Sequence, residues 1–210
     1  MSQAAQPRRV RADAQRSTAR ILEAAEAVLA VDANATLERI ADAAGLARAT
    51  VHRRFSSRKA LLEALIQQLN GRYLLALEQA RVQTAPPAIA LHRLSEIVFE
   101  LKISHRFVIE LAADPRTREP ILSAEILEGL DLLFARLYAA GAITAADPAW
   151  GRRVYLALLQ EVDQLSESDL GRAVNGPADD RGARADLLVR TVIGALGGPR
   201  DGNLVARQVP

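Results

Sequence analysis

The 210-residue chain is half hydrophobic and one quarter charged, a balance typical of a folded globular protein that argues against wholesale disorder. It contains no Cys, which excludes disulfides, a thiol nucleophile and thiolate metal sites, and its three His (His52, His92 and His105) are scattered, so we expect no metal site and no cofactor. Residues 1–60 hold 11 basic and 6 acidic residues (net +5) and the other 150 hold 16 and 19 (net −3), which indicates a polyanion-binding N-terminal part on a mildly acidic body.

The N-terminal residues have no apolar core of the kind that a secretion signal requires. No stretch approaches the roughly 18 uncharged apolar residues needed to span a bilayer. We therefore expect a soluble cytoplasmic protein with no membrane contact.

Apolar residues recur at helical spacing along the whole chain, and no alternating runs or hairpin turns interrupt them. The first predicted helix carries its stripe over residues 21–29. A second runs from an N-cap at Thr36 to about residue 44, where Gly45 lets the backbone turn. A third covers 47–54, and Ser56-Ser57 precedes a long helix that continues to about residue 83. The fold class is therefore all-α.

Further helices are predicted in the rest of the chain, after a break at Pro86-Pro87. A stripe over 94–101 is followed by a short helix at 107–111. A long helix over 122–137 stops at Gly141, and Asp147-Pro148 opens the next one. After a turn at Asn175-Gly176-Pro177, the last helix carries apolar residues on more than one stripe, so it is either deeply buried or part of an interface.

The segment from Thr36 to Phe55 has the pattern of a helix-turn-helix. A small residue is needed where the two helices cross, a glycine makes the turn, and an apolar residue of the second helix points back into the shared core. These positions form the predicted core of the motif: Ile40, Ala41, Gly45, Val51 and Phe55. The opposite face of the second helix carries groups able to contact base edges or phosphates in a DNA groove, namely Arg48, Thr50, His52 and Arg53.

Residues 16–65 resemble the DNA-binding domain of the TetR family of transcriptional regulators. The matching residues are Thr36, Ile40, Ala41, Ala44, Gly45, Leu46, Thr50, Val51, Phe55, Ser57, Arg58 and Leu61. Ala47 replaces a capping Ser of the family pattern, His52 a Tyr and Arg54 a His, while Arg58 replaces a Lys and keeps its positive charge. These departures affect the DNA sequence that would be read rather than the mode of binding.

The resemblance implies roles for individual residues. Arg48, Thr50, His52 and Arg53 are expected at base edges, and Thr36, Arg58 and Lys59 at phosphates. Thr36 could equally be only a helix cap, the cations of the second helix could be solvated surface, and Arg54 could pair with acidic residues of the body. Arg8, Arg9 and Arg11 form either an arm in the minor groove or a tail without a fixed contact.

The resemblance also implies a division of the chain into a flexible basic arm (1–15), a helix-turn-helix domain (16–65), a helical effector-binding and dimerisation domain (66–197) and a flexible tail (198–210). A homodimer through the last two helices, about 148–168 and 181–197, would present two recognition helices to a palindromic operator. The protein would be a repressor released by an unidentified small molecule. Candidate effector contacts, each of which could instead be an ordinary core or interface residue, are His105, Glu110, Tyr138, Trp150, Tyr155 and Gln160.

The sequence also bears on two other classes of function. The chain lacks the common nucleotide-binding, hydrolase and metalloprotease motifs, so no enzyme is predicted. A helical adaptor that uses its helix-turn-helix only for protein contacts is the main alternative, and Arg48 and Arg53 on the exposed face argue against it.

Overall fold

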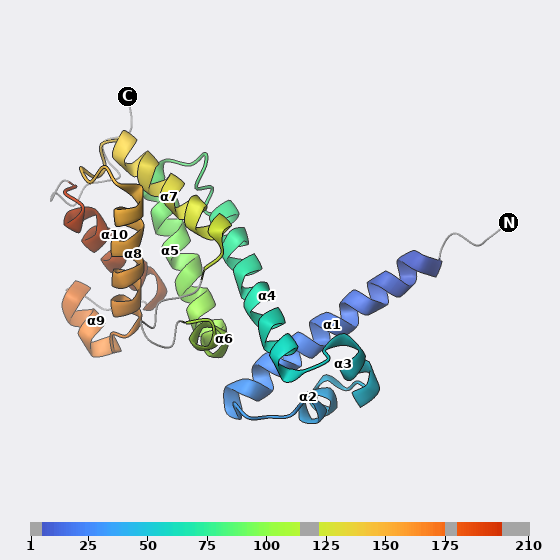
Figure 1. Cartoon of the computed structure of the whole chain (residues 1–210). Coiled ribbons are helices and arrows are strands. Elements are labelled where there is room, and N and C mark those ends of the chain that lie inside the picture. Colours follow the sequence, from blue (N-terminus) through green and yellow to red (C-terminus); the bar gives the residue numbers. More distant parts are fainter. Residues whose placement is uncertain (1–5, 114–121, 175–179, 199–210) are drawn as a thin grey trace. The chain divides into compact units, whose positions relative to one another are not determined.

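The computed structural model of the chain describes residues 6–113, 122–174 and 180–198 (Figure 1). Within these ranges the backbone forms ten helices and no β-strand. The all-α prediction is therefore confirmed. None of the helices in this described part combines the length and the apolar character needed to cross a membrane.

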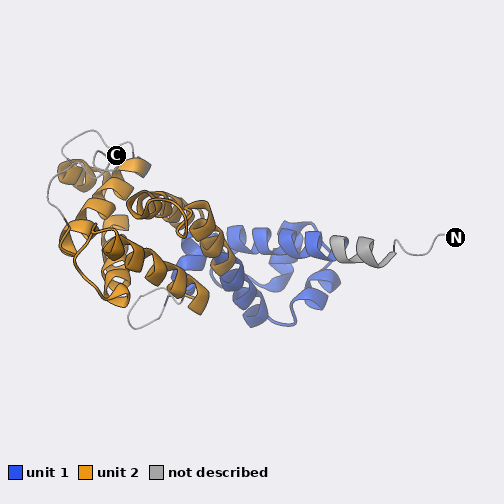
Figure 2. Cartoon of the chain, turned by 90° about the horizontal axis from the view of Figure 1, so that it is seen from above, with its two compact units in different colours: residues 1–69, 105–120 blue, residues 70–104, 121–210 orange. Residues whose placement is uncertain are grey.

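The chain divides into two compact units (Figure 2). Unit 1 comprises Met1–Leu69 and His105–Pro120, and unit 2 comprises Asn70–Ser104 and Ile121–Pro210. We predicted one boundary near residue 65. The division differs because a later segment, residues 105–120, returns to unit 1, and this return depends on tertiary packing that sequence patterns do not reveal.

Unit 1 contains α1 (Gln6–Val31), α2 (Leu37–Ala44), α3 (Arg48–Arg54), the first part of α4 (Arg58–Gln79) and α6 (Arg106–Leu111). Helix α1 packs against α2 and α6, and α2 packs against α3. The core residues of this unit are apolar side chains on the inner faces of the helices: Ile21, Ala25, Leu29, Ile40, Ala41, Val51, Leu61 and Leu65. Three of the five predicted core positions of the helix-turn-helix are in this list, and Phe55 is also buried.

Local sequence signals fix the ends of the short helices in unit 1. Thr36 caps α2, because its hydroxyl accepts a hydrogen bond from the backbone N–H of Arg39 over 3.4 Å. Gly45 ends α2 in the left-handed region, at φ 62° and ψ 37°, a conformation that costs other residues about 1–2 kcal/mol. The Ser57 hydroxyl accepts from the N–H of Ala60 at the start of α4. Ala47, at the N-cap of α3, provides no such bond.

Helix α1 begins at Gln6, inside the range predicted as a flexible arm, 1–15. The segment is rich in Ala, Arg and Gln, which are strong helix formers, and Pro7 falls in the first turn, where it needs no N–H partner. The side chains of Arg8, Arg9 and Arg11 lie outside the described residues, as does most of the predicted tail at 198–210.

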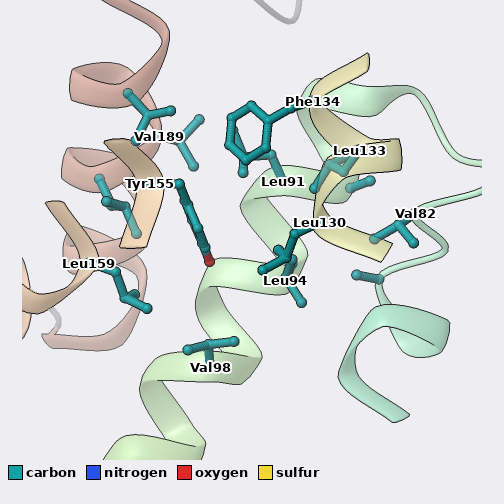
Figure 3. Packing of buried hydrophobic residues seen from close by; sticks show 14 of the residues in the cluster. Val82, Leu91, Leu94, Val98, Leu130, Leu133, Phe134, Tyr155, Leu159 and Val189 are labelled. Carbon is teal, nitrogen blue, oxygen red and sulfur yellow. The ribbon is translucent and has the colours of Figure 1, made fainter. Parts of the chain in front are cut away.

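Unit 2 contains the rest of α4 together with α5 (Pro87–Ser104), α7 (Ala124–Ala139), α8 (Pro148–Asp163), α9 (Glu167–Val174) and α10 (Asp180–Ala195). Helix α10 packs on α5, α8 and α9, while α7 packs on α5 and α8. Figure 3 shows side chains of α5, α7, α8 and α10 meeting in one core, where the Phe134 and Tyr155 ring centroids lie 6.0 Å apart. The unit is thus a helical bundle with an aromatic pair near its centre.

Two predictions about the end of the chain need correction. The helix expected over 148–168 stops at Asp163, and a separate helix, α9, lies between it and α10, so the two ranges named for dimerisation are not the last two helices. The extra apolar stripe of α10 is accounted for inside its own unit, since Leu188, Val192 and Ile193 are all buried. The predicted continuation of α4 to about residue 83 also fails, because the helix ends at Gln79 and Arg81 adopts a positive φ of 54°.

Candidate nucleic-acid interface

Helix α3 has one buried and one exposed face. Val51 is fully buried and holds the helix on its neighbours. Arg48, His52 and Arg53 are exposed, and Thr50 is half-buried. The structure therefore brings the four predicted base-edge residues together on one short helix, with three of them open to solvent.

Two of these side chains are paired with carboxylates of α2. Arg48 Nη2 lies 3.9 Å from Asp42 Oδ2, and His52 Nε2 lies 3.1 Å from Glu38 Oε1. All four side chains are between two-fifths and seven-tenths exposed, so each ion pair contributes little to stability in water. Arg53 and Arg54 have no ion pair or hydrogen bond with any residue that the structure describes, so the predicted alternative for Arg54 has no support among them.

Glu38 lies on this surface, and its pKa is shifted by its surroundings. Its pKa is lowered from the usual value by a hydrogen bond from its own backbone N–H, and further by hydrogen bonds from His52 and Thr36. The carboxylate is therefore held in its ionised, accepting form, beside the exposed face of α3.

The predicted phosphate contacts lie at the N-terminal ends of α2 and α4. Thr36 is exposed and caps α2, which agrees with the simpler alternative and leaves a phosphate contact untested. Arg58 donates a hydrogen bond to the carbonyl of Ala33, between α1 and α2. The Lys59 side chain is 86% exposed, with its Nζ 3.8 Å from Glu63 Oε1. Arg58 thus has a structural contact that sequence patterns did not predict.

Two more arginines make contacts within the motif, and the sequence patterns did not predict either contact. Arg20 of α1 donates to the carbonyl of Ala44 over 2.7 Å, and Arg39 of α2 pairs with Asp32 over 2.6 Å. The first contact joins α1 to the end of α2, and the second joins α2 to the residue that follows α1. Their residue types carry no signal of this role, because each contact depends on the packing of separate segments.

The six predicted effector contacts do not form one cluster. His105 and Glu110 belong to unit 1, where His105 pairs with Glu26 of α1 and Glu110 with Arg106. Tyr138 and Trp150 are about half exposed, and the Arg153 guanidinium lies 5.7 Å from the Trp150 ring centroid. Tyr155 and Gln160 are inside unit 2 on α8, each bonded to a residue of α5.

A polar cluster inside unit 2 links α5 with α8. Lys102, whose side chain is only 10% exposed, has its Nζ 3.1 Å from Asp163 Oδ2 and 3.0 Å from Gln160 Oε1. The Tyr155 hydroxyl lies 3.4 Å from Ser95 Oγ, and burial raises the pKa of Tyr155 to about 12. Sequence reasoning found Tyr155 and Gln160 but missed Lys102, although it is one of only two lysines in the chain.

Tyr73, in the part of α4 that belongs to unit 2, lies close to this cluster. Burial raises its pKa above the usual range, and the charges of Tyr155 and Asp163 raise it further. The described residues contain no group of three His, Asp or Glu placed to hold a metal ion. The polar groups that α5 and α8 place together in unit 2 are thus those around the ion pair of Lys102 and Asp163.

Comparisons with known proteins agree with this geometry. Residues 21–65 match the family described as bacterial regulatory proteins, tetR family. The HTH-type transcriptional repressor LfrR of Mycolicibacterium smegmatis (strain ATCC 700084 / mc(2)155) is 35% identical over 162 residues, which are 75% of this chain and 83% of LfrR.

Two solved structures extend the likeness over most of the chain. The TetR-like transcriptional regulator LfrR from Mycobacterium smegmatis, in complex with proflavine, has a TM-score of 0.55 at 29% identity and covers 84% of this chain and 95% of its own. A protein with unknown function from Rhodococcus sp. RHA1 has a TM-score of 0.63 at 21% identity, with 86% and 95% covered, and supports the fold alone. The matched helix-turn-helix, the all-helical second unit and the identity to LfrR place this chain in the TetR family of transcriptional regulators.

Proposed function

We propose that this protein is a cytoplasmic repressor that binds a palindromic operator as a homodimer and leaves it when a small molecule binds unit 2. The observation that carries the DNA-binding part is the exposed face of α3. It presents Arg48, His52 and Arg53 to solvent, while Val51 anchors the opposite face. A helix of this kind fits the major groove of B-DNA.

The side chains divide into two roles on this proposal. Arg48 and Arg53 are long enough to donate two hydrogen bonds to guanine, and Thr50 and His52 would contact neighbouring bases. Thr36, Arg58 and Lys59 would fix the position of the motif by contacts to phosphates, which carry no sequence information. In the absence of DNA, Asp42 is the partner of Arg48, and this weak, exposed pair would yield to the duplex.

Dimerisation is proposed through α8 and α10, with α9 lying between them in the chain. What supports it is the family and the exposed residues that both helices retain: Trp150 and Arg153 on α8, and Thr191 and Gly194 on α10. A side chain added at Gly194 would meet no atom within 4 Å in a single chain. Gly194→Glu should therefore leave the subunit folded and weaken the dimer, whereas Gly71→Glu, at an equally open glycine of α4, should leave the dimer intact in analytical ultracentrifugation.

The effector would bind in unit 2, near Tyr155 and Gln160, where Lys102 and Asp163 add polar contacts. Such a ligand releases DNA only if it binds the DNA-free form more tightly than the DNA-bound form. Proflavine, which is bound to LfrR in a solved structure, is a suitable first probe. Compounds that bind unit 2 tightly and leave operator affinity unchanged would contradict this part of the proposal.

The decisive experiment is selection of bound sequences from a random duplex pool, followed by affinity measurements at several salt concentrations. We expect two half-sites related by a two-fold axis, one helical turn of about 34 Å apart or a multiple of it. Specific binding should exceed binding to random DNA by at least about a thousandfold. Equal affinity for every sequence, with no enriched motif, would favour the protein-binding adaptor instead.

A further inference from the structure

The contact between Glu38 and His52 joins the start of α2 to the exposed side of α3. His52 Nε2 lies 3.1 Å from Glu38 Oε1, and both side chains remain nearly half exposed. His52 stands one turn after Arg48 and next to Arg53 on the helix proposed to enter the groove. The pair is thus part of the surface that would meet base edges, and not part of the core beneath it.

The chemistry of this pair fixes the proton arrangement of the imidazole. An ionised carboxylate can only accept hydrogen bonds, so Nε2 must carry the hydrogen that it donates to Glu38. In the neutral ring the second nitrogen, Nδ1, is then an acceptor. Nδ1 has no partner among the described residues, so its lone pair is available to an incoming ligand.

We propose that Glu38 is a specificity-determining residue, which acts through His52 to make α3 read a base that carries an exocyclic amine. In the major groove only adenine N6 and cytosine N4 offer a donor to such an acceptor. This inference rests on the proposed function, since it requires α3 to lie in the groove. Glu38 is a positioning residue in this scheme, because it holds the tautomer of His52 and need not touch the base itself.

Glu38 is better suited to this role than Asp42, the other carboxylate on the same side of α2. Glu38 Oε1 lies 3.1 Å from His52 Nε2, within ordinary hydrogen-bond distance. Asp42 lies 3.9 Å from Arg48, beyond ordinary hydrogen-bond distance. Arg48 also has donors only, so no partner can change what it offers to a base. Asp42→Asn is therefore a matched control for a change at Glu38.

The experiment is selection from random duplexes with the full chain, followed by competition between operators that differ at one position. In the wild type at pH 8 we expect one position of each half-site to favour adenine or cytosine, and His52→Ala to abolish that preference. Glu38→Gln should weaken it about fivefold, the usual effect of one hydrogen bond, because an amide can accept from Nε2 or donate to it and so supports both tautomers.

The outcomes separate this inference from the proposed function. A wild type that favours no sequence overturns the proposed function. If the wild type selects an operator and Glu38→Gln keeps the same preference at every position, only the role of Glu38 is overturned. The same holds if Asp42→Asn broadens that position as much as Glu38→Gln does. Equal thermal unfolding temperatures of the two variants would show that loss of fold is not the cause of either result.

Discussion

Arg20 on α1 donates through Nη2 to the backbone carbonyl of Ala44, the last residue of α2, over 2.7 Å. The last carbonyls of a helix have no partner inside the helix and carry its partial negative charge. The guanidinium therefore satisfies an acceptor and offsets the dipole at the point where Gly45 turns the chain toward α3. One side chain of α1 thus stabilises the C-terminal end of α2, the helix against which α3 packs.

Arg20→Ala should lower the free energy of unfolding by about 1–2 kcal/mol, because it leaves this helix end without its charged donor. Urea unfolding followed by circular dichroism measures the change. Arg16→Ala is the matched control, since Arg16 pairs only with Asp13 one turn away on the same helix, at the surface. Equal losses for the two variants would mean that the contact with Ala44 adds nothing to stability.

Substitutions on α3 and α4 should separate base contacts from phosphate contacts. Arg53→Ala or Arg48→Ala should cost about 1–3 kcal/mol of operator binding and relax the base preference at one position. Lys59→Ala should weaken binding to all sequences alike and lower the salt slope by about one unit. Fluorescence anisotropy with operator and random duplexes measures both effects.

Arg58→Ala tests the same phosphate role under a structural complication. Because Arg58 also donates to the carbonyl of Ala33, its loss should lower the stability of unit 1 as well as the affinity for DNA. Its unfolding curve must therefore be measured beside its binding curve. If Arg48→Ala loses as much affinity for random DNA as for the operator, Arg48 contacts DNA phosphates and not base edges.

The parts of the fold that sequence predicted well are those fixed by neighbouring residues. Thr36, Gly45 and Ser57 mark helix ends through bonds or dihedral angles that span at most five residues, so their meaning can be read locally. Helix α9 was missed although the same kind of signal was present. Ser166 accepts from the N–H of Asp169 and donates to its carboxylate, a reciprocal cap that could have been found in the sequence.

The candidate site was predicted only in part, for the opposite reason. The face of α3 follows from helical periodicity, and the comparisons leave its individual base contacts as predictions. Arg20 and Ala44 are 24 residues apart, and Lys102 and Gln160 are 58 apart. Such contacts depend on how whole helices pack, and no local pattern marks them. The six proposed effector residues do not form one cluster for the same reason. A polar residue within an apolar stripe gives the same sequence pattern whether or not it lies near the others in the folded chain.

The ion pair between Lys102 and Asp163 should stabilise unit 2. Lys102→Met leaves a carboxylate beside a largely buried site without its partner, and we expect a loss of about 2 kcal/mol in the free energy of unfolding. Adding Asp163→Asn should recover part of this loss, because the unpaired charge is then gone. Chemical denaturation of the single and double variants gives the coupling energy of the pair. A coupling energy near zero would show that the pair contributes nothing.

Tyr155 should make the protein less stable in alkaline solution. Its folded pKa of about 12 lies above the unfolded value of 10.0, so between these pH values the unfolded chain releases a proton that the folded chain keeps. Stability is therefore complete below about pH 10 and falls with rising pH by about 1.4 kcal/mol per unit. Tyr155→Phe should unfold with a flatter pH dependence and cost at most about 1 kcal/mol at pH 7, since only a 3.4 Å bond to Ser95 is lost. If the free energy of unfolding of Tyr155→Phe falls with pH as steeply as that of the wild type, this account is contradicted.

Gly151 is required by the packing of α8 against α7. It is buried, and a Cβ atom there would lie 2.6 Å from Cδ1 and 2.9 Å from Cγ of Phe134, whose ring is itself buried and tilted against that of Tyr155. Alanine is a better helix former than glycine by about 1 kcal/mol, so a change from glycine to alanine stabilises a helix where the added Cβ meets no other atom. In Gly151→Ala the ring would have to move within a close-packed core, and we expect a net loss of about 1–2 kcal/mol. Gly71→Ala, where a Cβ meets nothing within 4 Å, should instead gain about 0.5–1 kcal/mol in thermal unfolding. If both variants gain stability, the ring can move without cost, and the contact with Phe134 does not explain the glycine.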